Sequence, residues 1–281
     1  MIFLNPCIDV AFKKIFGSEE HKRVTISFLN SILELINNDQ INDIQFLNTE
    51  QNSIRDDKKE NYLDILCTDQ NKNSYIVEVQ VRNVKSFDKR LVYYAAKTYT
   101  LQLGAAQSYI TLKPVIAISI LGFTLFPDKK SYKSIHKILD TKTYEHNIKE
   151  IAFAFVELPK FIKKESELIS NEDKWLYFLK NISKQNNIPE PLQTGEFKEA
   201  CSSAERMTWS EHELNSYENA IIKATDIQGS LELAEEKGMI KGKLEEKTEI
   251  AKNLLAAGVS QEIIIKTTGL TTEQIRTIKN S

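Results

Sequence analysis

The chain has 281 residues, of which 41% are hydrophobic and 27% charged, and its formal net charge is −2 at pH 7. A chain of this length can bury a full core and suggests one large domain with an appendage, or two domains. The charge balance gives no general argument for nucleic-acid binding, so a DNA site would have to be local. The three cysteines are far apart and lack zinc-site spacing, which indicates buried or idle thiols.

No segment has the pattern of a membrane span or a secretion signal. The longest apolar run, residues 114–126, is shorter than the ~20 residues that a spanning helix needs. The N-terminus has no early basic region ahead of an apolar stretch and no small-residue cleavage site. We therefore expect a cytoplasmic protein with no membrane partner.

The first two predicted elements are helices. Asn5 as N-cap, Pro6 at the first helical position and Gly17 as a stop predict a short helix. Ser18 can cap a second helix, in which apolar residues recur at helical spacing up to Leu35. The apolar side of this second helix is expected to face the core.

A mixed sheet follows these helices. Residues rich in β-branched and aromatic side chains between polar turns predict strands at 41–50, 62–68, 74–82, 114–121 and 151–158. A helix with a 3.6-residue period over 85–107 lies between the third and fourth strands, as the crossover of a parallel pair would. The predicted fold class is α/β.

Three regions are expected along the chain. Residues 1–161 form the α/β domain, residues 162–213 a helical linker region, and residues 214–281 a helical C-terminal tail.

Glycines and capping residues subdivide the end of the tail. Gly258 and Gly269, with Ser260 and Thr271 as caps, divide it into three short helices. The sequence TTEQ at residues 271–274 has the pattern of a capping box.

The predicted hairpin over residues 62–82 places acidic residues inside the sheet. With the two-residue period of a strand, Ile76, Glu78 and Gln80 share one face. A five-residue loop over 69–73 would put Asp64 directly opposite Glu78, with Cβ atoms ~5 Å apart. Two carboxylates at that range near the middle of a sheet either share a proton or hold a cation.

A hard divalent cation such as Mg²⁺ resolves this repulsion best. Mg²⁺ takes oxygen ligands and is typically held by one or two carboxylates plus substrate phosphates. Gln80, on the same face as Glu78, can orient a bound water or a phosphate oxygen. The same pattern also fits the solvent face of an ordinary hairpin, and by itself it does not decide between the two.

These residues carry a family resemblance. "YLDIL" and "YIVEVQ" resemble the D…ExK half-motif of the PD-(D/E)XK nuclease superfamily, in the variant in which Gln replaces Lys. Residues 9–33, 87–123 and 154–161 are similar to the PD-(D/E)XK nuclease family transposases, also called the recombination-promoting nuclease/putative transposase family. The resemblance is continuous over residues 1–161.

This resemblance implies a restriction-endonuclease-like mixed β-sheet core flanked by helices and followed by an all-helical C-terminal region. It implies a DNA endonuclease of the transposase or recombination-promoting type that uses Mg²⁺, with Mn²⁺ as an alternative ion. Asp64 and Glu78 would be metal ligands together with the backbone carbonyl of Val79, and Gln80 would take the place of the catalytic Lys.

Two departures from the motif put full activity in doubt. Leu63 stands where the motif has Pro, and Gln80 cannot carry the charge of a Lys. An alternative within the same family is a catalytically silent DNA-binding or protein-interaction member.

Asp9 and Lys59 are candidates for accessory roles. Superfamily members often supply another acid from the first helix, and Lys59 is the nearest lysine before Asp64. Each also has a simpler interpretation, because Asp9 can stabilise a helix dipole and Lys59 can be a solvated loop residue.

Arg90, Tyr94 and Lys97, on adjoining turns of the long helix, are the candidates for DNA binding. Arg90 could contact phosphate with Tyr94 packed beneath it, although Tyr94 fits the core equally well.

The C-terminal tail resembles the helical tail of the same family, and its ending looks like a small helix-turn-helix. A DNA-reading helix from Thr272 would offer Arg276 and Lys279 as its cations. Homo-oligomerisation, expected as a dimer, or simple packing is favoured for this region over DNA reading.

Overall fold

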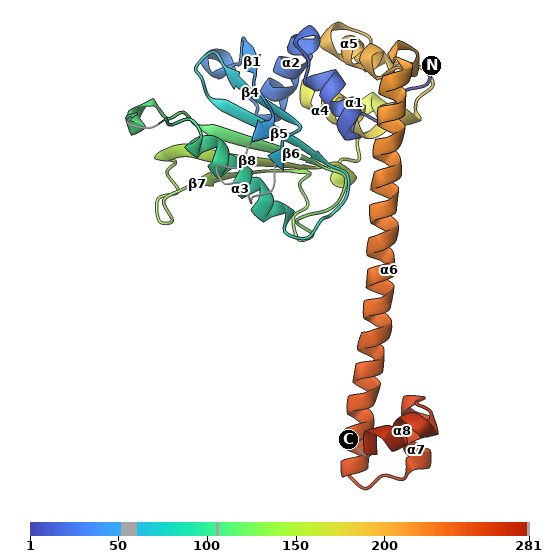
Figure 1. The fold of residues 1–281 in the computed structure, drawn as a ribbon. Helices are drawn as coiled ribbons and strands as arrows, with labels where there is room; N and C mark the ends of the chain where they lie inside the picture. The colour runs from blue at the N-terminus through green and yellow to red at the C-terminus, as the bar shows by residue number, and fades with distance from the viewer. Residues whose placement is uncertain (52–60, 105–106, 280–281) are drawn as a thin grey trace. The chain divides into compact units, whose positions relative to one another are not determined.

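The computed structural model describes residues 1–51, 61–104 and 107–279. The chain divides into two compact units, residues 1–220 and residues 221–281. The larger unit contains a six-stranded mixed sheet with the strand order β1-β4-β5-β6-β8-β7 (Figure 1). Its strands are β1 (Ile44–Phe46), β4 (Ile65–Asp69), β5 (Ser74–Gln80), β6 (Val115–Leu121), β7 (Lys133–Ile138) and β8 (Ile148–Glu157). A separate two-stranded sheet pairs β2 (Glu50–Gln51) with β3 (Asn61–Tyr62).

Helices cover both faces of the six-stranded sheet. The helices of the larger unit are α1 (Asp9–Phe16), α2 (Lys22–Ile32), α3 (Phe87–Thr100), α4 (Asn171–Asn181) and α5 (Gly195–Ala204). The first residues of α6 (Glu211–Ala256) also belong to this unit. The order of elements and the mixed sheet agree with the predicted α/β class.

The start of α1 differs from the prediction. The helix begins at Asp9 with Ile8 as N-cap, so the predicted cap Asn5 and first position Pro6 are wrong. The Asn5 side chain instead accepts a hydrogen bond from the Cys7 N–H at 3.0 Å, which closes a local turn before the helix. Gly17 does end α1, and Ser18 accepts the His21 N–H as predicted, although it caps a short 3-10 turn that leads into α2.

Each of the five predicted strands overlaps a strand of the sheet, and the sequence prediction missed β7. This strand lies at the sheet edge beside β8, and its residues are half-buried or exposed. Its apolar residues are interrupted by the polar side chains of Lys133, His136 and Lys137. Charged residues of this kind protect the edge of a sheet from pairing with other strands. They also break the alternating pattern by which a strand is predicted from sequence.

The α3 crossover is confirmed. Strands β5 and β6 are parallel and in continuous register from Ser74 opposite Val115 to Gln80 opposite Leu121, with α3 between them in the chain. The buried residues Phe87, Leu91 and Tyr94 of α3 pack on one face of the sheet. Because Ile76 belongs to this same cluster, Glu78 and Gln80, two and four residues further along β5, also face α3.

The opposite face of the sheet packs against α1, α2, α4 and α5 in the main hydrophobic core. Phe16 lies at the centre of an aromatic cluster, with ring centroids 4.9 Å from Phe28, 5.6 Å from Trp175 and 6.2 Å from Phe178. Residues from the range 162–213, expected as a helical linker region, therefore share one core with the first two helices.

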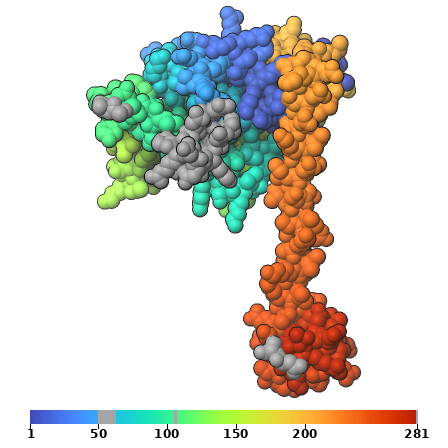
Figure 2. Space-filling model, in the orientation of Figure 1, coloured from blue at the N-terminus to red at the C-terminus, as the bar shows by residue number. Residues whose placement is uncertain are grey.

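In the smaller unit, α6 continues to Ala256 and is followed by α7 (Gln261–Thr268) and α8 (Thr272–Lys279). The expectation of three short helices is wrong for the first of them, because the residues before Gly258 complete the 46-residue helix α6. Figure 2 shows the side chains of α7 and α8 gathered against the end of α6. Their buried core consists of Ala251, Ile264, Leu270 and Ile275.

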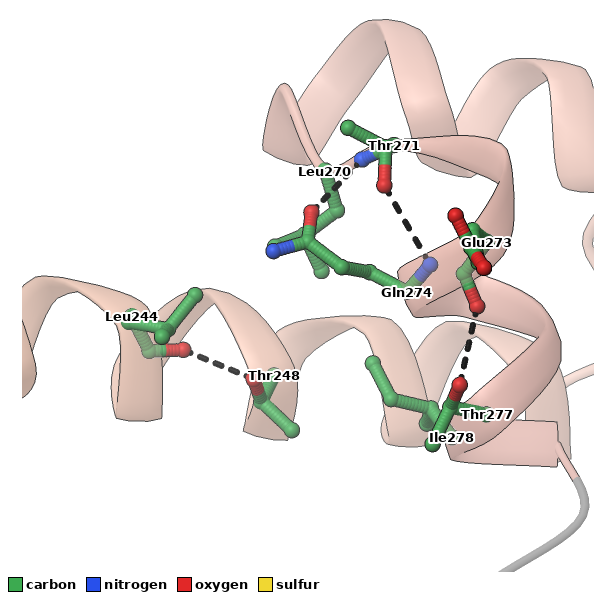
Figure 3. A pocket seen from close by; sticks show the side chains of 8 residues that line it. All are labelled: Leu244, Thr248, Leu270, Thr271, Glu273, Gln274, Thr277 and Ile278. Carbon is green, nitrogen blue, oxygen red and sulfur yellow. Dashed lines mark hydrogen bonds between the residues drawn. The ribbon is translucent and has the colours of Figure 1, made fainter.

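The turn between α7 and α8 has the predicted caps. Gly269 ends α7 with a φ of 65°, a left-handed conformation that favours glycine. The Thr271 N–H donates to Gln274 Oε1 at 2.8 Å and the Gln274 N–H donates to Thr271 Oγ1 at 3.3 Å, which confirms the capping box (Figure 3). Among the residues that the structure describes, no helix has both the length and the apolar character to cross a membrane.

Candidate functional site

The β4–β5 hairpin brings the two predicted acids together. Strand pairing places Thr68 opposite Ser74, Leu66 opposite Ile76 and Ile65 opposite Val77, which confirms the predicted register. The next pair in this register is Asp64 and Glu78. Both acids lie at the point where β4 begins and the ladder of the hairpin ends.

Side-chain hydrogen bonds replace the ladder at this point. The Leu63 N–H donates to the Thr49 carbonyl, so the chain before Asp64 leaves β5. The Val79 N–H then donates to Asp64 Oδ2 at 2.8 Å, and the Asp64 N–H donates to Glu78 Oε1 at 3.2 Å. Asp64 Oδ1 and Glu78 Oε2 take no part in these two bonds. The Val79 carbonyl points to the same side of β5 as its N–H, which is the side of Asp64.

Burial dominates the electrostatics of the pair. The Glu78 side chain is buried and that of Asp64 is only 12% exposed. Burial raises the pKa of Asp64, and the nearby charge of Asp9 adds to the rise, while the Val79 N–H and Lys13 oppose it. Burial also raises the pKa of Glu78, and the charge of Asp64 adds to that rise. The pair therefore resists full ionisation unless a cation compensates the charge.

Helix α1 contributes a lysine to the same place. Lys13 Nζ lies 2.8 Å from Asp9 Oδ1, one turn earlier in the helix, and 3.7 Å from Asp64 Oδ1. Burial alone would lower the pKa of Lys13, but its hydrogen bond to Asp9 and the charges of Asp9, Asp64 and Glu78 outweigh this and raise the pKa. Asp9 thus acts on the site both through its ion pair with Lys13 and through its own effect on the pKa of Asp64.

Gln80 and Arg90 are joined directly. Arg90 Nη2 donates to Gln80 Oε1 at 2.6 Å, and Gln80 Nε2 donates to the Arg82 carbonyl at 3.0 Å. The Arg90 guanidinium also lies over the Phe87 ring, 5.2 Å from its centroid. Helix α3 therefore presents a fixed positive charge beside the ExQ strand.

Three buried polar atoms near this strand lack a hydrogen-bond partner among the described residues. They are Ser119 Oγ, Arg90 Nε and Arg82 Nη1. Ser119 is the direct neighbour of Glu78 across the β5–β6 pair. An unsatisfied buried donor costs about 1–3 kcal/mol, so such atoms are expected where a ligand, an ion or water completes the site.

The other predicted residues differ in their placement. Tyr94 is buried in the α3 cluster, and burial raises its pKa, so its core interpretation is the one that the packing supports. Lys97 is half-buried one turn further along α3. Lys59 lies in the range 52–60, outside the described residues.

Sequence reasoning missed Lys13 and Ser119 near the carboxylates and Arg82 beside Gln80. The sequence did contain a signal for Lys13, because this residue follows the candidate Asp9 by four positions on the same helix and can pair with it. Ser119 is the one polar residue within the buried part of its strand, from Ala117 to Leu121. Arg82 had no distinguishing signal.

The donor set fits a hard divalent ion. Among the residues with a described placement, no group of three or more His, Cys, Asp or Glu could hold a metal ion. A site with two carboxylates and one backbone carbonyl is nevertheless what Mg²⁺ uses when waters and a substrate phosphate supply its other ligands. The orphaned hydroxyl of Ser119 beside Glu78 is a suitable partner for such a water.

A mixed sheet between helices, with an acidic pair and an ExQ sequence on adjacent strands, defines a restriction-endonuclease-like class of protein. The family model for the PD-(D/E)XK nuclease family transposase matches residues 6–234, and the chain belongs to this family. A second model, the C-terminal HTH domain of the Rpn/YhgA-like nuclease family, matches residues 244–280. No curated protein matches the chain, and no solved structure does.

Proposed function

We propose that the protein is a Mg²⁺-dependent DNA endonuclease of the transposase or recombination-promoting type, with Mn²⁺ as an alternative ion. The observation that carries this proposal is the pairing of Asp64 with Glu78 at the end of the hairpin ladder, in a chain of a nuclease family. Each carboxylate is held by one backbone N–H, which leaves its second oxygen outside these two bonds.

Asp64, Glu78 and the Val79 carbonyl would hold the ion. When bound, Mg²⁺ lowers the pKa of a coordinated water and offsets negative charge on the phosphate. In the hydrolysis, the water oxygen forms a new bond to phosphorus and the bond from phosphorus to the leaving oxygen breaks. The water loses one proton to solvent, and the leaving oxygen takes one up.

The chain's own residues position the reacting groups. Two backbone N–H groups fix the orientation of the two carboxylates, and burial excludes water from their flanks. Asp9 holds Lys13 beside Asp64, which places a compensating charge there in a metal-free protein. Asp9 is therefore an accessory residue of this site in our proposal.

We propose that α7 and α8 give the protein a second contact with DNA. The HTH match covers both helices, and the Gly269 turn and the capping box at Thr271 fix the start of α8. As the second helix of the motif, α8 would enter the major groove, where Arg276 and Lys279 are its cations.

We further propose that the chain forms a homodimer through α6. Ile227, Leu231, Ala234 and Gly238 are all exposed and follow each other at intervals of four, three and four residues, the spacing of a coiled-coil seam. Ile227 and Leu231 are 54% and 47% exposed, and their shared stripe is the apolar surface that a second copy would cover in our proposal.

The alternative is a catalytically silent DNA-binding or protein-interaction member of the family. The neutral Gln80 and the C-terminal HTH match favour it, since an HTH domain can hold DNA without cutting it. The decisive experiment incubates purified protein with supercoiled plasmid and Mg²⁺, with and without a chelator. Nicking or linearisation that the chelator abolishes supports the endonuclease. Tight binding without cleavage, in Mg²⁺ and in Mn²⁺, supports the silent member.

A further inference from the structure

The ExQ strand lacks the charge that the motif lysine would supply, and an arginine lies in contact with the residue that replaces it. Gln80 occupies the lysine position, and its Oε1 accepts a hydrogen bond from Arg90 Nη2 at 2.6 Å. The amide orientation is unambiguous, because a guanidinium only donates and the Arg82 carbonyl, 3.0 Å from Gln80 Nε2, only accepts. One end of the Gln80 amide therefore holds the Arg90 side chain, and the other end anchors the amide itself to the backbone.

The Arg90 guanidinium has an unused donor, and its charge opposes the rise of the Glu78 pKa. Its partner Gln80 is neutral, and its other close contact is the ring of Phe87. The buried Nε has no hydrogen-bond partner among the residues with a described placement. A planar guanidinium with an unused N–H is suited to a phosphate oxygen.

Lys13 is the competing source of charge at this site. Its ammonium forms an ion pair with Asp9 at 2.8 Å and lies 3.7 Å from Asp64 Oδ1, so carboxylates already compensate it. Arg90 forms no ion pair with any residue that the structure describes, and it lies on the side of Gln80, where the motif requires the cation.

We propose that Arg90 is a catalytic residue that contacts the non-bridging oxygens of the scissile phosphodiester, and that Gln80 is the positioning residue that holds it there. Together the two residues replace the single lysine of the motif. This inference rests on the proposed endonuclease function. Arginine does not deprotonate in proteins, so its role is electrostatic and is distinct from that of a general base.

The test is a set of single-turnover cleavage rates at saturating protein and Mg²⁺, so that changes in DNA affinity do not affect the rate. Arg90→Met should slow cleavage by about 10²–10³-fold, the usual cost of losing one preorganised electrostatic donor. Lys89→Met removes a charge from the adjacent, exposed position of α3 and should leave the rate within about two-fold. Thermal unfolding of each variant checks that it is folded.

A rescue experiment with Gln80→Lys shows whether Arg90 replaces the motif lysine or has only a structural role. In a Gln80→Lys background, Arg90→Met should cost less than about ten-fold, because the lysine supplies the charge. Gln80→Ala should slow cleavage by about ten-fold or more, and Gln80→Ala/Arg90→Met should be no slower than Arg90→Met alone. Such non-additivity is expected when one residue acts only through the other.

Each contrary result has a distinct meaning. If the wild-type protein does not cleave DNA, both the proposed function and this inference are wrong. If the wild type is active and Arg90→Met cleaves within about three-fold of the wild-type rate, the inference is overturned but the proposed function stands. The inference is likewise overturned if Arg90→Met still abolishes cleavage in the Gln80→Lys background. A Gln80→Lys protein that is folded but inactive also overturns it, since the lysine then cannot do what the pair does.

Discussion

The Val79 N–H donates to Asp64 Oδ2 at 2.8 Å at the position where the β4–β5 ladder ends. A side chain here takes over a backbone hydrogen bond, and this fixes one carboxylate oxygen, while the other, Oδ1, lies 3.7 Å from Lys13 Nζ. The Glu78 carboxylate is fixed in the same way by the Asp64 N–H. The reciprocal arrangement makes the two acids a single structural feature, so the effects of changing them should be coupled.

Asp64→Asn or Glu78→Gln should slow DNA cleavage by more than about 100-fold, because either change removes a negatively charged oxygen ligand. DNA affinity should stay within a few-fold, since contacts from Lys and Arg to phosphate dominate affinity. Plasmid nicking assays and fluorescence anisotropy measure the two quantities. Asp88→Asn, an exposed acid on α3, is the control and should cleave normally. Retained nicking in either site variant would rule out this metal site.

The acidic pair should make the metal-free protein less stable as pH rises. The folded-state pKa of both carboxyls lies above the ordinary values of 3.8 and 4.5, so the folded state binds more protons than the unfolded state over this window. The free energy of unfolding then falls from about pH 4 upward until both groups have ionised. Glu78→Gln should weaken this dependence and raise the melting temperature at pH 8 by about 2–4 °C. A steeper pH dependence in the variant would contradict the assignment.

Divalent ions should stabilise the wild type whether or not the protein cleaves DNA. Binding to the folded state alone raises stability with the logarithm of the ion concentration. Millimolar Mg²⁺ or Mn²⁺ should therefore raise the melting temperature of the wild type at pH 8, and Glu78→Gln should lose most of this shift. Equal shifts in the two proteins would place the ion elsewhere.

The larger unit should depend on α4 for its stability. Trp175 is fully buried among Phe16, Phe28 and Phe178, and its replacement by Ala should cost about 3–5 kcal/mol. Urea unfolding followed by circular dichroism measures this loss. Ile169→Ala, an 88% exposed position just before α4, should change the free energy of unfolding by less than about 0.5 kcal/mol. A small effect of Trp175→Ala would mean that α4 is dispensable for this core.

Arg276→Ala combined with Lys279→Ala should weaken DNA binding by about ten-fold and lower the salt dependence of the affinity by about two phosphate contacts. The single-turnover cleavage rate at saturating protein should not change, because these residues belong to the HTH region and not to the acidic pair. The exposed Lys237→Ala on α6 controls for loss of charge. Unchanged affinity in the double variant would argue against DNA reading by α8.

Leu231→Glu should dissociate the proposed dimer into monomers, because it puts a charge into the predicted seam. Light scattering coupled to size-exclusion chromatography measures the mass. Leu233→Glu is a matched control, since this leucine is similarly exposed but points away from the stripe that Leu231 shares with Ile227. A monomeric wild type, or dissociation by both variants alike, would contradict the seam.

The sequence alone determined the features that depend on local periodicity. The alternation of Ile76, Glu78 and Gln80, together with the length of the 69–73 loop, was sufficient to predict the register that sets Asp64 against Glu78. The 3.6-residue repeat and its place between two strands predicted α3 as a parallel crossover. The capping box after Gly269 was also readable, because its partners are three residues apart.

Tertiary structure decided which groups from distant segments complete the site. Lys13 is 51 residues from Asp64 in the chain, and it reaches that carboxylate because α1 packs close to the start of β4. Ser119 neighbours Glu78 only through the β5–β6 pairing, and Arg90 meets Gln80 only after α3 has folded back over the sheet. Periodicity fixes the face on which a side chain lies, but not which side chain of another element it meets, because that depends on how the helices pack on the sheet.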